Sequence, residues 1–219
     1  MHWGHRATEL EEVQHYKYLG SYISADSNIE KEISTRIGLA AQAFNRLRNV
    51  WKSTSLQTKT KLRIYNSNVR SVLLYASETW RMNKKIGSRL KGFEERCLRQ
   101  VSKLRWEQCV TNIKVIRPTG INNIVLEVKQ RHWRWLSHVL RMNKSRQPQR
   151  ALRWAPPGKR HREEMATVGK TWNEISWLAK VRDGWRRFIG ELCSTRSEED
   201  KKVNNSIHTR ARHKCLARA

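Results

Sequence analysis

Four basic side chains recur at helical spacing in the stretch RHWRWLSHVLRM, residues 131–142. Arg131, Arg134, His138 and Arg141 are three or four residues apart, which places them on one face of a helix. A row of such groups can bind oxyanions, for example the phosphates of a nucleic-acid backbone. The spacing fits equally well a second interpretation, the solvated face of a basic protein.

Tryptophans accompany these basic groups. The chain has ten, and seven of them are next to a Lys or Arg in the sequence. Indole rings beside cationic groups can stack on bases, and Trp133, Trp135 and Trp154 are the candidates for this role. The alternative for any tryptophan is a place in the core. We expect it for three that fall in phase with apolar stripes, namely Trp51, Trp172 and Trp185.

A second basic motif is RWAPPGKRHR, residues 153–162. Its prolines stiffen the backbone and its glycine permits close approach to a ligand, so Lys159 and Arg160 are candidates for gripping phosphate. Pro148 and the Pro-Pro-Gly run predict a loop over residues 143–163. The motif is not a P-loop, because it lacks the Gly-Lys-Ser/Thr ending.

Catalytic and metal-binding patterns are absent from the sequence. Its three aspartates occur singly, whereas two-metal phosphoryl transfer needs clustered carboxylates. The four cysteines are far apart, with no Cys-x-x-Cys, so we expect reduced thiols and neither a metal nor another cofactor in this chain. The sequence therefore indicates binding rather than catalysis.

Charge favours a polyanionic partner. The formal net charge is +26, and residues 31–170 hold 32 Lys and Arg against 8 Asp and Glu. Such a charge repels itself, and nucleic acid would relieve that repulsion. An anionic membrane surface ranks second, although no apolar segment is long enough to span a membrane. The N-terminal residues lack the layout of a signal peptide, so we expect an intracellular protein.

The elements that must position these residues are mostly helical. Apolar residues at steps of three and four predict helices over about 27–51, 54–76, 83–104, 122–142, 171–178 and 183–192. Four of these helices have candidate N-terminal caps: Ser27–Glu30, Thr54–Gln57, Asn83 and Thr171–Glu174, while Asp183 is a plausible cap for the last. Residues 13–24 predict a strand or hairpin. The fold class is mainly α, with a short N-terminal hairpin before a helical bundle and a smaller helical region.

Seven stretches, in this order, resemble the C-terminal third of the reverse transcriptase of non-LTR (LINE-type) retrotransposons. They are EEVQHYKYLGSYIS, EISTRIGLAAQAFNRLRNVW, KTKLRIYNSNVRSVLLYASETW, FEERCLRQV, RHWRWLSHVLRM, PPGKR and DGWRRFIGELC. Each motif alone is weak, but their common order over roughly residues 8–200 is specific.

The resemblance implies a role for each part of the chain. Residues 1–26 would be the remnant of the polymerase palm, with Tyr18, Leu19, Gly20 and Ser21 as its primer-grip turn. Residues 27–105 would be the helical thumb, 106–196 the basic region beyond it, and 197–219 a disordered tail. The implied partners are an RNA template and a DNA primer, or their hybrid. The Mg²⁺-binding aspartates of the palm, and the endonuclease of the parent polyprotein, would lie in segments that this sequence lacks.

Two departures from the family pattern are visible. Family members usually continue the Gly-Lys-Arg loop with Arg-Gly-Arg-Pro, whereas GKRHR here runs into EEMATVGKTW, which indicates a short deletion. Residues 201–219 have no family counterpart. We therefore expect a truncated reverse transcriptase without its catalytic palm, in the nucleus by analogy with retroelements. The alternatives are a stand-alone basic helical protein that binds nucleic acid or an acidic partner, and an expressed gene fragment without a selected function.

Overall fold

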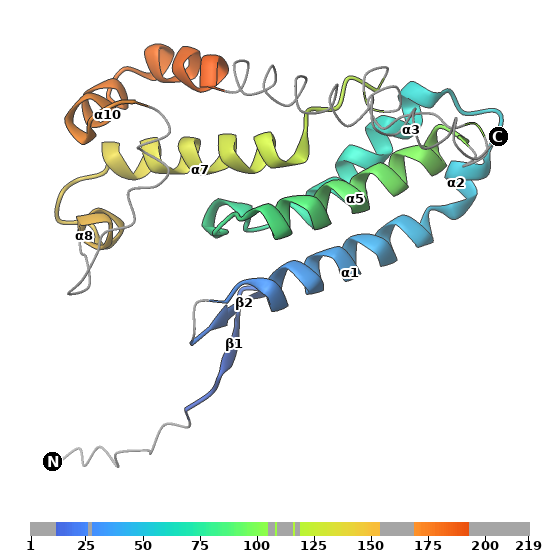
Figure 1. Ribbon diagram of the computed structural model, residues 1–219, viewed down its shortest axis with the longest axis horizontal. Helices are drawn as coiled ribbons and strands as arrows, with labels where there is room; N and C mark the ends of the chain where they lie inside the picture. Colours follow the sequence, from blue (N-terminus) through green and yellow to red (C-terminus); the bar gives the residue numbers. More distant parts are fainter. Residues whose placement is uncertain are drawn as a thin grey trace, which may run out of the picture. The chain divides into compact units, whose positions relative to one another are not determined.

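The computed structural model describes residues 12–25, 28–104, 108, 116, 119–153 and 169–192. A short hairpin is followed by helices, as the sequence predicts (Figure 1). The chain divides into two compact units, residues 1–125 and 126–219. The sequence placed a boundary near residue 105; Ile121 and Ile124, which are buried, still belong to the first unit.

The hairpin consists of β1 (His15–Tyr18) and β2 (Ser21–Ser24). The two strands are antiparallel, and Tyr18 is opposite Ser21. Only Leu19 and Gly20 connect them, and both have positive φ, 47° and 82°. Positive φ at both central residues is the geometry of the two-residue turns that match the twist of paired strands.

The first unit continues with helices that are joined by short connections (Figure 1). They are α1 (Glu30–Arg46), α2 (Arg48–Lys52), α3 (Thr58–Tyr65), the π-helical turn η1 (Asn66–Arg70), α4 (Ser71–Leu73), the 3-10 turn η2 (Ser77–Thr79) and α5 (Lys84–Val101). The sequence predicted one uninterrupted helix where α3, η1 and α4 follow one another. A π turn accommodates one extra residue and so shifts which of the following residues face the core. Leu74 is accordingly buried, whereas Val72 is only half-buried.

The core of the first unit follows the predicted apolar stripes. Ile33, Ala40 and Phe44 of α1 are buried, as are Leu90 and Phe93 of α5. The predicted core position of Trp51 is confirmed: its ring stacks on Phe44 at 5.0 Å, and its Nε1 donates to the Phe44 carbonyl at 2.8 Å. Burial of these large side chains holds the helices together.

The structure confirms two of the first four predicted N-terminal helix caps and contradicts one. The Asn83 side chain accepts from the Ile86 backbone N–H, and Thr171 and Glu174 form a complete capping box, so both predictions are confirmed. The Thr54 box is wrong, because α3 begins only at Thr58 with Gln57 as its N-cap residue. Ser27 lies outside the described residues; α1 begins at Glu30, whose N–H is accepted by Asn28.

The second unit contains most of α7 (Ile124–Arg141), then α8 (Gln147–Arg153), α10 (Trp172–Leu178) and a helix over residues 182–192. Its core joins Trp133 of α7 to Ile175 and Ala179 and to Trp185, Phe188 and Ile189. Trp185 is 3% exposed, so its predicted core position is confirmed.

Three sequence expectations about the second unit are wrong. The expected loop 143–163 contains α8 over residues 147–153, because Pro148 is in the first turn, where a missing N–H removes no helical hydrogen bond; residues 154–163 lie outside the described residues. Asp183 is not an N-cap residue, since the last helix already includes Arg182. Trp172 is 36% exposed, because it is at the first position of α10, before the stripe that packs inward.

Candidate nucleic-acid interface

The hairpin turn presents an apolar side chain on strained backbone. Leu19 is 73% exposed and has φ 47°, in the left-handed region that residues with a Cβ avoid. Tyr18 and Ser21, two further residues of the predicted primer-grip turn, pair at the end of the strands. A strained conformation persists only where surrounding groups enforce it, and such places are often functional.

Two side chains enforce the turn from outside the hairpin. The Tyr75 hydroxyl donates to the Leu19 carbonyl at 2.8 Å, and Arg36 Nη2 donates to the Gly20 carbonyl at 2.5 Å. The Arg36 guanidinium also lies over the Tyr75 ring, 4.4 Å from its centroid. Both carbonyls of the turn therefore accept a hydrogen bond from a side chain, and the two donor side chains are in contact with each other.

Arg36 is in turn fixed by Glu32, one helical turn earlier on α1. Arg36 Nε donates to Glu32 Oε1 at 2.7 Å, and the Tyr22 backbone N–H donates to Glu32 Oε2 at 2.7 Å. Glu32 and Arg36 are 2% and 5% exposed, so the pair is buried. The sequence prediction missed Glu32, Arg36 and Tyr75. The i,i+4 pair of opposite charges inside an apolar stripe was the signal that could have pointed to the first two.

The predicted basic ridge of α7 does not act as one row. Arg131 Nε lies 3.4 Å from Glu127 Oε1, and that arginine is only 28% exposed. His138 is exposed, with its ring 5.5 Å from the ring of Trp135. Arg134 and Arg141 line a cleft instead. The predicted ridge is thus divided: His138 is exposed at the surface, whereas Arg134 and Arg141 line the cleft.

The prediction that Trp133 stacks on bases needs correction. Its side chain is 9% exposed, and its ring is 5.9 Å from those of Trp185 and Phe188. A ring packed in the core has no face left for a base. Trp135 is 46% exposed and is the accessible tryptophan of this helix. Trp154, Lys159 and Arg160, the other predicted contacts, lie outside the described residues.

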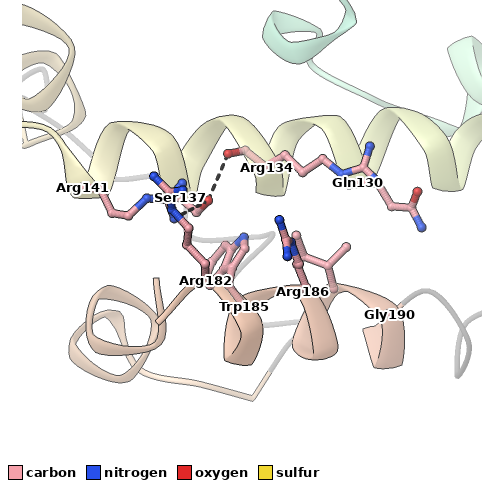
Figure 2. Close-up of a pocket in the computed structure, with 9 residues that line it drawn as sticks. Gln130, Arg134, Ser137, Arg141, Arg182, Trp185, Arg186 and Gly190 are labelled. Carbon is pink, nitrogen blue, oxygen red and sulfur yellow. Dashed lines mark hydrogen bonds between the residues drawn. The ribbon is translucent and has the colours of Figure 1, made fainter. Parts of the chain in front are cut away.

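The cleft lies between α7 and the helix over 182–192 (Figure 2). Its volume is about 510 Å³, within the range of pockets that bind ligands. Arg182 and Arg186 reach from the last helix towards α7 in Figure 2. The lining residues are Gln130, Arg134, Ser137, Arg141, Arg182, Trp185, Arg186, Ile189 and Gly190.

Hydrogen bonds hold one of the four cleft arginines in place. Arg141 Nη1 donates to Ser137 Oγ at 3.0 Å and to the Ala179 carbonyl at 2.9 Å, and Ser137 Oγ donates to the Arg134 carbonyl. Arg186 Nη1 lies 3.2 Å from Asp183 Oδ1, with both side chains largely exposed. Four guanidinium groups around one cleft, with no carboxylate among the lining residues, form a surface suited to oxyanions.

The sequence prediction missed Arg182 and Arg186. They are one helical turn apart, on a face that they share with Trp185 and Ile189. The motif DGWRRFIGELC contained Arg186, and Arg182 immediately precedes it, but their meeting with Arg134 and Arg141 is a tertiary contact that spacing within one helix does not show.

Other kinds of site find little support among the described residues. They contain no group of three His, Cys, Asp or Glu side chains that could hold a metal ion. None of the described helices is long and apolar enough to cross a membrane. Cys97 is buried in the core, and burial raises the pKa of its thiol to about 12, which makes it a poor nucleophile.

Comparison with known proteins gives one relative over most of the chain. The chain is 28% identical over 200 residues to the transposon-derived protein F52C9.6 of Caenorhabditis elegans. It resembles a transposon-derived protein. The similarity covers 90% of this chain and 66% of the relative, so the chain spans just under two thirds of the relative's length.

Two further comparisons complete this result. The domain of unknown function DUF6451 matches residues 43–75, from the end of α1 to the segment that carries Tyr75. No solved structure matches the chain significantly. The transposon-related origin expected from the sequence is thus supported at this general level.

Proposed function

We propose that this chain is the nucleic-acid-binding part of a transposon-derived reverse transcriptase, corresponding to its primer-grip turn, thumb and basic C-terminal region. Its ligand is an RNA template paired with a DNA primer. The observation that carries the proposal is the clamp on the turn, in which Tyr75 and Arg36 hold the carbonyls of Leu19 and Gly20.

The clamp supports this function for an energetic reason. A hairpin of two short strands is marginal in water, and this one leaves its apolar side chains largely exposed. Tyr16, Tyr18 and Ile23 are each more than half exposed. The turn is nevertheless fixed by a buried ion pair, so the fold maintains a rigid apolar projection at the surface. Such a projection suits contact with the sugars and bases at the end of a paired strand.

Charge supports the choice of partner. The chain carries +26, and the described parts of both units have many exposed Lys and Arg. Phosphate contacts would supply most of the affinity, and the shape of the duplex would supply selectivity. An RNA–DNA hybrid differs from a DNA duplex in groove shape and in its 2′-hydroxyls, both of which proteins can distinguish.

A competition assay tests the proposal. The full chain is bound to a labelled RNA–DNA hybrid, and unlabelled hybrid, DNA duplex of the same sequence and polyglutamate are added. We expect the DNA duplex to compete about tenfold less well than the hybrid, and polyglutamate less well still. Equal competition by all three polyanions would contradict the proposal and would favour the alternative of a basic protein that binds acidic partners in general.

A further inference from the structure

The arginine cleft of the second unit has features that its own fold does not explain. Arg134 and Arg141 come from α7, and Arg182 and Arg186 from the last helix. No lining residue is acidic; Asp183, which pairs with Arg186, does not line the cleft, and its side chain is 83% exposed. Within the described residues, the guanidinium groups of Arg134 and Arg182 make no hydrogen bond or ion pair.

Like charges gathered around one concavity repel each other, more strongly where the walls exclude water. Apolar or uncharged side chains at these positions would stabilise the packing of the two helices better than four arginines do. The concentration of positive charge is therefore a feature that a bound anion would stabilise.

Trp185 provides an independent observation. It is 3% exposed and lines the cleft, yet its Nε1 is buried without a hydrogen-bond partner among the described residues. Buried donors are nearly always paired, and an acceptor that entered the cleft would pair this N–H. Phosphate oxygens are acceptors for both indole N–H and guanidinium groups.

We propose that the arginine cleft binds the phosphate groups of a single nucleic-acid strand, and so forms a second binding site besides the turn of the first unit. The inference deepens the proposed function and rests on it. Arg141, already oriented by Ser137 and the Ala179 carbonyl, is the fixed donor, while Arg134 and Arg182 close on the strand when it enters.

The size of the cleft favours a single strand as the occupant. A volume of about 510 Å³ between two helices admits a short stretch of one strand, whereas a duplex is too wide to enter. The apolar part of the lining, with Ile189 and Gly190, adjoins the arginines and suits a sugar or a base edge. Nothing in the lining selects a particular base, so the cleft binds strands with little sequence preference.

The test compares two double variants of the full chain that lose the same charge. Arg134→Ala/Arg182→Ala removes two cleft arginines that make no bond with described residues, so folding should be preserved. Arg150→Ala/Arg187→Ala removes two exposed arginines of the same unit that do not line the cleft. Binding to a single-stranded oligonucleotide is measured by fluorescence anisotropy over a salt series, and circular dichroism checks the fold.

The cleft variant is expected to bind at least about tenfold more weakly, with a log–log salt slope about 1.4 lower, the value for two lost phosphate contacts on a single strand. The control variant should change much less. Arg134→Lys/Arg182→Lys keeps the charge but loses the forked donors, and we expect it to lose affinity while it keeps the slope. Equal losses in the cleft and control variants would overturn the proposal.

Two further arms separate the possible outcomes. Inorganic phosphate and pyrophosphate are added as competitors, because a site for free phosphate would be blocked by them at millimolar concentration, whereas a strand site would not. Strong competition would overturn the assignment to a strand. Hybrid preference of the unmodified chain is measured in parallel, so that a failed cleft can be distinguished from a failure of the proposed function as a whole.

Discussion

The hydroxyl of Tyr75 donates a hydrogen bond of 2.8 Å to the carbonyl of Leu19, which precedes it by 56 residues. This bond ties the hairpin turn to the segment that ends the α3–α4 helical stretch. Together with Arg36 it explains how a non-glycine residue is kept in the left-handed conformation at an exposed position. The turn is therefore a property of the first unit and not of the hairpin alone.

Replacement of Tyr75 by Phe should loosen the turn and leave the unit folded. The ring that lies against Arg36 is retained, and only the hydroxyl is lost, so the free energy of unfolding should fall by about 1 kcal/mol. Amide hydrogen exchange at Leu19 and Gly20 should accelerate, and affinity for the RNA–DNA hybrid should fall. Tyr16→Phe is the control, since Tyr16 is exposed on β1, and it should change none of these quantities. Identical exchange rates in both variants would show that the bond does not hold the turn.

Glycine substitutions separate backbone strain from packing. Gly20 has φ 82°, and a Cβ there would meet nothing within 4 Å, so Gly20→Ala introduces strain alone. We expect a loss of about 1 kcal/mol in the free energy of unfolding, measured in urea. Gly38, within α1, also has open space around a Cβ but no positive φ. Gly38→Ala should therefore stabilise the chain, by up to about 1 kcal/mol. A stabilising Gly20→Ala would mean that the turn does not keep its left-handed conformation.

Glu94 should make the stability of the first unit depend on pH. Burial raises the pKa of this carboxyl from 4.5 to about 7, although Arg70 Nε lies 3.0 Å from its Oε1 and opposes the shift. The folded state thus holds a proton that the unfolded state releases. Stability contributed by the protonated group is fully present below pH 4.5 and declines as pH rises towards 7.

The Glu94→Gln variant checks this sign. Its stability relative to the unmodified chain should increase between pH 4.5 and pH 7.5, by on the order of 3 kcal/mol at most. The measurement is a set of urea unfolding curves for both proteins at several pH values. A difference that stays constant over this range would show that the pKa of Glu94 is not raised in the folded chain, and a change in the opposite direction would show that it is lowered.

Two tryptophans on α7 should respond in opposite ways to truncation. Trp133 is in the core of the second unit, so Trp133→Ala should lower the free energy of unfolding by about 3–5 kcal/mol. Trp135 is 46% exposed, and Trp135→Ala should leave stability within about 1 kcal/mol. If bases stack on α7, only Trp135→Ala should weaken binding in a folded protein. Reduced binding by a stably folded Trp133 variant would restore the original stacking prediction.

The sequence predicted what depends on one helix at a time. The steps from Ile33 through Ala40 to Phe44 located the buried face of α1, and Asn83 marked the start of α5, because periodicity and capping are local. The stacking prediction for Trp133 was wrong because the position of this ring depends on a contact between helices. Helical spacing says which residues share a face, but the partner that covers the face comes from residues 172–192, far along the chain.

The candidate site shows the same limit. The basic residues of α7 were found from their spacing, whereas the cleft also needs Arg182 and Arg186, which only the packing of the last helix brings to Arg134 and Arg141. Likewise, the turn at Leu19 and Gly20 was located by sequence, but Tyr75, which holds it, has no pattern that links it to a hairpin.

Salt dependence of binding tests the central claim most directly. Affinity of the full chain for an RNA–DNA hybrid, a DNA duplex and heparin is measured between about 50 and 200 mM salt. We predict a steep linear fall of log affinity with log salt for the hybrid, consistent with several phosphate contacts, and tighter binding of the hybrid than of the other two at every salt concentration. Shallow curves that coincide for all three ligands would contradict the account, because the charge of +26 would then act only as non-specific attraction.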